Sequence, residues 1–162
     1  MANAIVTKRL LMVQMAVEDA VALVDGRHPN GRPWAPGYPD DGAIMAAGLT
    51  VTAAQRGSEL GDFGTYQIIR REDGSVIGAA GFMGAPDETG AVRVGYGLAE
   101  SARRQGYATE ALRGLLEWAR TQDGLTCVLA DTTRTNVPSQ KVMERAGMKR
   151  VGEDGELLYY MA

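Results

Sequence analysis

The sequence has little of what disulfide-linked, zinc-bound or membrane-spanning proteins need. It has 162 residues, with one cysteine (Cys127) and one histidine (His28). A single cysteine cannot form a disulfide within the chain, and one cysteine and one histidine cannot supply the ligands of a structural zinc site. No apolar run approaches the ~20 residues that span a bilayer. The sequence therefore excludes a disulfide scaffold and predicts neither a metal nor a membrane partner.

An excess of basic charge is also missing. The chain has 17 Lys and Arg against 20 Asp and Glu, for a formal net charge of −3. General nucleic-acid binding needs a basic surface, so no nucleic-acid partner is expected. The first residues, MANAIVTKRLLMVQMAVEDA, lack a basic segment followed by a long apolar stretch. We therefore expect no secretory signal, a cytoplasmic location and, from the length, a single domain over residues 1–162.

Hydrophobic periodicity predicts a mixed α/β protein with helices on the faces of its sheet. The predicted strands cover residues 8–14, 65–71, 75–83, 91–98, 125–131, 148–154 and 156–162. The predicted helices cover residues 17–25, 43–56, 108–119 and 136–147. The segment 26–42 is so rich in proline and glycine that it is predicted to be a long loop, and such loops are often functional.

The stretch ESARRQGYATEA, residues 100–111, lies between a predicted strand and a predicted helix. The first turn of a helix has unpaired N–H groups and a partial positive charge. Gly106 permits close approach to the backbone, and Arg103 and Arg104 add forked cationic donors. The stretch is thus a candidate phosphate or pyrophosphate site. The alternative is two surface arginines beside an ordinary helix start.

Two familiar phosphate motifs do not fit this stretch. No GxxxxGK[ST] string occurs, so a P-loop is excluded. The string GYGLAE, residues 95–100, begins as GxG but ends in glutamate, where a dinucleotide fingerprint needs glycine or alanine.

Two strings together resemble the GNAT acetyltransferases. Residues 103–108 read R-x-x-G-x-A, similar to the acyl-CoA motif of that family, and residues 136–148 read N-x-x-S-(x)7-G-M, similar to its later strand and helix. The wider string VGYGLAESARRQGYATEALRGLLEWA resembles the ribosomal-protein N-terminal acetyltransferases. The resemblance implies the GNAT fold, a mixed and mostly antiparallel sheet with helices on both faces.

The resemblance also implies how acetyl-CoA, the expected cosubstrate, is bound without a metal. The strand Val94–Leu98 is expected to splay from 125–131 and to pair with the pantetheine arm. Asn136 is expected to bond the same arm, and Arg103 and Arg104 to assist the pyrophosphate. The implied cofactor-binding residues are Tyr96, Gly97, Leu98, Arg103, Arg104, Gln105, Gly106, Tyr107, Ala108, Thr109, Asn136 and Ser139.

The catalytic groups are less clearly indicated. Ser139 is expected to protonate or stabilise the leaving thiolate, because the last helix lacks the tyrosine that does so in many relatives. Many relatives carry a glutamate base where this chain has Arg93, and arginine cannot act as a base at ordinary pH. Asp131 is one substitute and Glu88 another, but either can equally be a solvated surface carboxylate.

The residues predicted to bind the acceptor lie in the loop 26–42. Trp34 and Tyr38 are candidate substrate-binding residues, because aromatic rings can enclose an amine. The alternative is that they pin the loop to the core.

The sequence therefore predicts an acetyl-CoA-dependent N-acetyltransferase acting on a primary amine of a small molecule or short peptide, and it is compatible with a homodimer. A ribosomal-type acetyltransferase of protein N-termini is the alternative within the class. A non-catalytic acyl-CoA-binding module and a nucleotide-binding protein are the alternatives outside it.

Overall fold

A computed structural model describes residues 3–28, 31–58 and 60–162. Their strands are β1 (Ala4–Val6), β2 (Leu10–Gln14), β3 (Thr65–Arg70), β4 (Val76–Phe82), β5 (Ala91–Leu98), β6 (Cys127–Thr133), β7 (Lys149–Asp154) and β8 (Leu157–Met161). Their α-helices are α1 (Val17–Val24), α2 (Asp41–Gln55), α3 (Tyr107–Ala119) and α4 (Val137–Arg145). Short 3-10 turns, η1 (Gly61–Phe63) and η2 (Glu100–Ala102), lie before β3 and α3.

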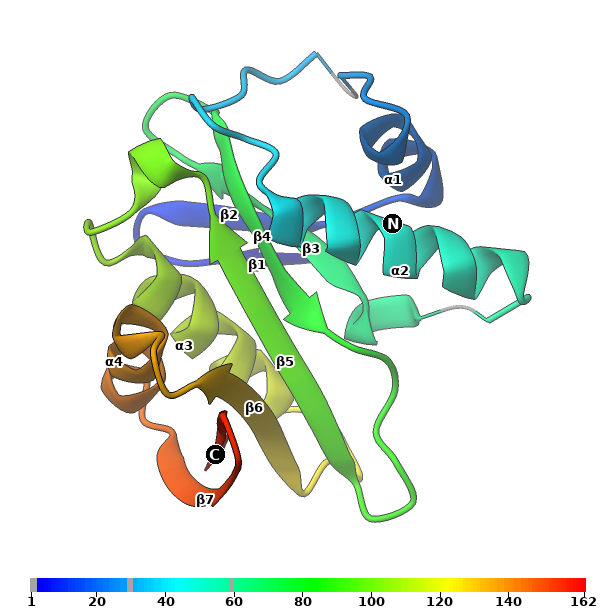
Figure 1. The fold of residues 1–162 in the computed structure, drawn as a ribbon. Coiled ribbons are helices and arrows are strands. Elements are labelled where there is room, and N and C mark those ends of the chain that lie inside the picture. The colour runs from blue at the N-terminus through cyan, green and yellow to red at the C-terminus, as the bar shows by residue number, and fades with distance from the viewer. Residues whose placement is uncertain (1–2, 29–30, 59) are drawn as a thin grey trace.

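The strands form one sheet in the order β1-β2-β3-β4-β5-β6-β8-β7. Every neighbouring pair is antiparallel except β5 and β6, which run parallel. Helices α1 and α2 lie together on one side of the sheet, and α3 and α4 lie together on the other (Figure 1). This is the mixed, mostly antiparallel α/β architecture that the sequence predicts.

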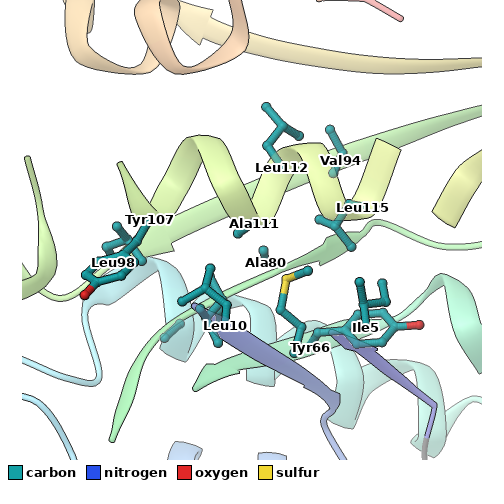
Figure 2. Close-up of a cluster of buried hydrophobic side chains, with 14 of the residues drawn as sticks. Ile5, Leu10, Tyr66, Ala80, Val94, Leu98, Tyr107, Ala111, Leu112 and Leu115 are labelled. Atoms are coloured by element: carbon teal, nitrogen blue, oxygen red, sulfur yellow. The ribbon is translucent and has the colours of Figure 1, made fainter. Parts of the chain in front are cut away.

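The main core lies between α3 and the sheet. Leu112 of α3 lies beside Val94 of β5, and Leu115 lies on the other side of the helix, where Ala80 and Leu10 lie (Figure 2). The apolar positions of α3 recur every three or four residues, so one stripe of the helix is buried. Small residues allow α3 to sit close to the sheet, because a Cβ on Gly114 would lie 2.9 Å from Met12 Cε.

Most predicted elements are confirmed to within two residues at each end, and β5 matches the predicted bounds. The short edge strand β1 is missed, because three residues give too little alternation to recognise. The loop before α2 is confirmed as irregular over its described residues. Pro33–Ala35 nevertheless joins the sheet, where Ala35 N donates to Val76 O at 3.0 Å and Val76 N donates to Pro33 O at 2.9 Å.

Candidate active site

The sheet splits between its two parallel strands. Strands β5 and β6 pair only over Ala91–Arg93, and the last of these pairs is Arg93 with Leu129. Beyond that point Val94–Leu98 runs away from β6 (Figure 1). The splay that the resemblance implied is therefore confirmed, and the edge of β5 that faces β6 is left without a ladder partner.

The backbone of β5 alternates between its two edges. Met83 N donates to Arg93 O at 2.9 Å, and Ala99 N donates to Ile77 O at 2.8 Å, so odd-numbered residues turn their backbone groups toward β4. The even-numbered residues, Tyr96 among them, therefore turn theirs into the split. An extended chain lying in the split can pair with these groups as an added strand would.

The turn before α3 and the first residues of that helix present six unpaired N–H groups at the mouth of the split. No acceptor among the described residues receives a hydrogen bond from the backbone N–H of residues 104–109. Arg104 and Gly106 have φ of 62° and 81°, and Arg104 is the one non-glycine residue with positive φ in the described ranges. Positive φ at a side-chain-bearing residue is strained and tends to occur at functional sites. These groups suit a phosphate.

Arg9, which the sequence reasoning overlooked, holds this turn in place. Its Nη1 donates to Gln105 O at 2.9 Å, its Nε donates to Glu110 Oε2 at 2.7 Å, and its guanidinium lies 4.4 Å from the centre of the Tyr107 ring. Thr7 Oγ1 also donates to Glu110 Oε1 at 2.6 Å. Burial alone would raise the pKa of Glu110, but the hydrogen bonds from Thr7 and Arg9 outweigh it and lower that pKa.

The predicted arginines and small residues lie around the same turn. Arg103 Nε donates to Leu98 O at 3.1 Å, which ties the end of β5 to the turn, and Arg104 is exposed. Gln105 Nε2 donates to Ser101 O at 3.1 Å. Residues 96–98 and 103–109 are thus brought together. Among the described residues no group of His, Cys, Asp or Glu side chains is placed to hold a metal ion.

Tyr96 and Ser139 meet across the split. The Tyr96 hydroxyl lies 2.7 Å from Ser139 Oγ and 3.2 Å from Ser139 O. Asn136 caps α4, since its Oδ1 accepts from Ser139 N at 3.3 Å, and this fixes where Ser139 lies. Burial raises the pKa of Tyr96 to about 12, against an opposing effect of the Ser139 hydrogen bond. The phenol therefore stays protonated at neutral pH.

The two carboxylates considered as bases are placed very differently. Asp131 Oδ1 accepts from Arg93 Nη1 at 2.6 Å, so the arginine that replaces the usual glutamate pairs with the proposed substitute. Glu88 precedes β5, at the end opposite to Tyr96. The side-chain pairing of Asp131 could not be inferred from the sequence.

On the opposite face of β5 a cavity of about 560 Å³ lies between α2 and the sheet. Its floor is made by small residues on neighbouring strands, and its walls include the exposed side chains of Met45, Leu49 and Met83. Side chains alternate along a strand, so Gly95 and Gly97 face this cavity while Tyr96 points the other way, toward α4. The floor residues that face α2 are Ala79, Gly81, Gly95 and Gly97.

Trp34 and Tyr38 belong to the loop that borders this cavity, but neither lines it. Their rings pack edge to face with centroids 5.3 Å apart, and Tyr38 is buried in the core. Burial raises the pKa of the Tyr38 phenol to about 12. Three buried side-chain polar atoms in the described residues lack a hydrogen-bond partner, and all belong to this loop: Trp34 Nε1, Tyr38 Oη and Asp40 Oδ1.

The sequence reasoning missed the cavity, its apolar walls and Asp40. One signal was present: in VGYGL the two glycines are spaced two apart, which places both on one face of a strand. The other parts come from segments distant in the chain, so no local pattern links them.

A parallel strand pair that splits beside a helix N-terminus is the architecture of the GNAT acyltransferase fold. The model of the acetyltransferase (GNAT) domain matches residues 9–149, and the chain belongs to this family.

Relatives agree with this assignment. The chain is 33% identical over 85 residues to the uncharacterized N-acetyltransferase YjdG of Bacillus subtilis (strain 168), a match that covers 52% of this chain and 51% of that protein. The chain spans about half the length of the curated relatives it matches.

Solved structures share the fold along nearly the whole chain. A RimL ribosomal L7/L12 alpha-N-protein acetyltransferase in complex with coenzyme A has a TM-score of 0.70 at 16% identity, covering 99% of this chain and 97% of that one. The ribosomal-protein-S5-alanine acetyltransferase from Vibrio fischeri has a TM-score of 0.69 at 16% identity, covering 99% and 96%. At this identity the likeness concerns the fold alone. None of the helices formed by the described residues is long and apolar enough to cross a membrane.

Proposed function

We propose that the chain is an acetyl-CoA-dependent N-acetyltransferase that acetylates a primary amine of a small molecule or short peptide. The observation that carries the proposal is the set of six unpaired N–H groups over residues 104–109, next to the split of β5 from β6. The helix end would receive the pyrophosphate and the β5 edge the pantetheine arm, with Asn136 on the same side of the split. The coenzyme A complex of the RimL neighbour is consistent with this ligand.

The reaction needs few catalytic groups, because a thioester is already an activated acyl donor. The neutral amine nitrogen forms a bond to the thioester carbonyl carbon, the C–S bond breaks, and the nitrogen loses one proton while the sulfur gains one. The products are an N-acetyl amide and free coenzyme A. The chain must position the two substrates, accept the proton and stabilise the charge that develops.

We assign Ser139 and Tyr96 to the departing sulfur. A phenol whose pKa is raised to about 12 holds its proton more tightly than a thiol with an ordinary value of ~8.5. Tyr96 therefore does not protonate the thiolate. Either hydroxyl can donate in the Tyr96–Ser139 pair. With Tyr96 as the donor, the Ser139 proton is free to hydrogen-bond to the sulfur and so to stabilise the thiolate until it is protonated.

Thiol release on mixing with acetyl-CoA tests the proposal, with a panel of small primary amines in one arm and N-terminal peptides in the other. Turnover of small amines supports the proposal, and turnover of peptides alone favours the ribosomal-type alternative. Stable binding of coenzyme A with no turnover of any amine identifies an acyl-CoA-binding module. Calorimetric titrations with coenzyme A, ATP and NAD add a control: binding of ATP without coenzyme A contradicts the cofactor assignment.

A further inference from the structure

We infer that Asp40 is the carboxylate that receives the acceptor amine and takes its proton, and that the acceptor is a small primary amine with an apolar body seated against α2. This inference rests on the proposed acetyltransferase function and names its substrate class and a further catalytic residue.

Asp40 occupies a helix N-cap position, but its side chain does not cap the helix. It is the N-cap residue of α2, where an aspartate usually accepts a hydrogen bond from the first turn. Its side chain makes no such bond, and its Oδ1 is buried without a partner. A buried carboxylate oxygen without a hydrogen bond is costly, so its retention needs an explanation.

The carboxylate is directed at the strand that carries the split. A Cβ on Gly97 would lie 2.9 Å from Asp40 Oδ2, and a Cβ on Gly42 would lie 3.2 Å from the same oxygen. Both glycines line the α2 cavity, whereas Asp40 itself is not among the lining residues, so the carboxylate lies directly behind the β5 end of that cavity. The absence of a side chain at Gly97 leaves room for Asp40 beside the strand whose other edge faces the split.

The cavity has the chemistry of an apolar ligand site, and the Asp40 carboxylate lies next to the two glycines at one end of it. Its volume of about 560 Å³ lies in the range typical of small-ligand pockets. Met45, Leu49 and Met83 are large apolar side chains that remain exposed on its walls. Arg56, the one charged side chain among its described lining residues, follows the last residue of α2, far from Asp40. An ammonium group is thus attracted to one end and repelled from the other.

The proton balance is simple. The ammonium R–NH3⁺ gives one proton to the Asp40 carboxylate, directly or through a water, and becomes R–NH2. The amine then attacks the thioester from the α2 side of β5. As the C–S bond breaks, the nitrogen loses its second proton and the departing sulfur, which Tyr96 and Ser139 meet from the α4 side, gains one. Asp40 releases the proton to solvent after the amide has formed and coenzyme A has left. Asp131 is a poorer candidate because Arg93 already occupies its Oδ1.

The test compares Asp40→Asn with Asp41→Asn, which removes the same charge from the adjacent, exposed first residue of the same helix. With 2-phenylethylamine as acceptor, Asp40→Asn is expected to lower kcat/KM by ~10²–10⁴-fold, the contribution of a placed base. Asp41→Asn is expected to change it by only about twofold. Asparagine also caps helices well, so the melting temperature of Asp40→Asn should match or exceed that of the wild type. Equal effects of the two variants overturn the inference.

An arylamine separates proton removal from simple binding. 4-Ethylaniline resembles 2-phenylethylamine in size but is neutral at pH 7, so it need not lose a proton before attack. The ratio of wild-type to Asp40→Asn activity should therefore be at least about tenfold smaller with 4-ethylaniline, within the range that proton transfer contributes. Equal ratios for the two amines would show that Asp40 takes no proton. A larger loss in Asp131→Asn than in Asp40→Asn would assign the base to Asp131.

The need for an apolar part in the acceptor amine can be tested with the wild-type chain alone. It should prefer 2-phenylethylamine to ethanolamine by at least about tenfold in kcat/KM, because burying an aromatic ring is strongly favourable. Equal use of both amines, or a preference for N-terminal peptides over every small amine, contradicts the substrate class. If no amine is acetylated, the proposed function fails and the inference falls with it. If amines are acetylated but Asp40→Asn is unaffected, only the inference falls.

Discussion

The two sides of β5 are built by different means. The donor region (Val94, Tyr96, Leu98 and residues 103–109 and 136–139) offers mainly backbone groups: unpaired N–H groups at a helix end and a free strand edge. The acceptor region (Asp40, Met45, Leu49, Met83 and the floor of the α2 cavity) offers side chains and the spaces left by glycines. Backbone groups are the same in every sequence, whereas side chains differ. The comparison shows why the donor is identified more readily than the acceptor.

The largest expected effect on the binding of acetyl-CoA is in the donor region alone. Gly106→Glu should lower the affinity for acetyl-CoA by ~10²–10³-fold, because the variant forces a side chain into a left-handed conformation and adds negative charge at the helix N-terminus. Asparagine tolerates positive φ and is neutral, so Gly106→Asn is the matched control and should retain most of the affinity. The KM for acetyl-CoA, measured in folded variants, decides the result. An unchanged KM in Gly106→Glu contradicts the pyrophosphate assignment.

A smaller loss is expected within the donor region, at the two hydroxyls assigned to the departing sulfur. Ser139→Ala should lower kcat by about 10- to 100-fold, since a hydrogen bond to a developing thiolate is worth ~1.5–3 kcal/mol. Tyr96→Phe should cost less, because it removes the group that orients Ser139 and not the one that contacts sulfur. Steady-state kinetics at saturating acetyl-CoA measures both variants. A greater loss in Tyr96→Phe than in Ser139→Ala contradicts the assigned roles.

Gly97→Ala tests the acceptor region from inside the strand. Its Cβ would lie 2.9 Å from Asp40 Oδ2, so the carboxylate must move and kcat should fall by roughly tenfold or more. Gly95→Ala is the matched control, because its Cβ meets only the flexible end of Met83, at 3.1 Å. Both variants should keep the wild-type KM for acetyl-CoA. If Gly95→Ala is the more damaging of the two, the position assigned to Asp40 is wrong.

The smallest expected effect concerns Glu110, which binds the Arg9 side chain that holds the turn before α3. Glu110→Gln should destabilise the fold by about 1 kcal/mol at pH 7, a value that allows for the partial exposure of Arg9. The pKa of Glu110 is lowered in the folded chain, so its contribution is present above the ordinary value and is lost on acidification. The difference from the wild type should therefore shrink as the pH falls below ~4.3. Urea unfolding at pH 7 and pH 4 measures it, and a constant difference refutes the role of the charge.

Local pattern was enough to predict most of the fold and the place of the donor region. The apolar stripe of α3 and the glycine at position 106 follow from short-range chemistry, and they lie where the sequence puts them. The three-residue strand β1 carries too little pattern to be found. The pairing of Tyr96 with Ser139 joins residues 43 positions apart, so it emerges only when the chain is folded.

The acceptor region was harder for the same reason. Its parts come from α2, from the end of β4 and from β5, and they are brought together by packing alone. The loop before α2 was predicted to bind the acceptor through Trp34 and Tyr38, and nothing in the sequence pointed to Asp40 in that role. Trp34 and Tyr38 turn inward and do not line the cavity, so their role in substrate binding stays a prediction.

The most direct test of two separate regions is the calorimetric titration of coenzyme A into the Asp40→Asn and Gly106→Glu variants. We expect Asp40→Asn to bind coenzyme A within about twofold of the wild type. We expect Gly106→Glu to lose ~10²-fold or more in affinity, from backbone strain and added charge at the helix end. Equal losses in the two variants, or a loss confined to Asp40→Asn, would contradict the division of the site into a donor and an acceptor region.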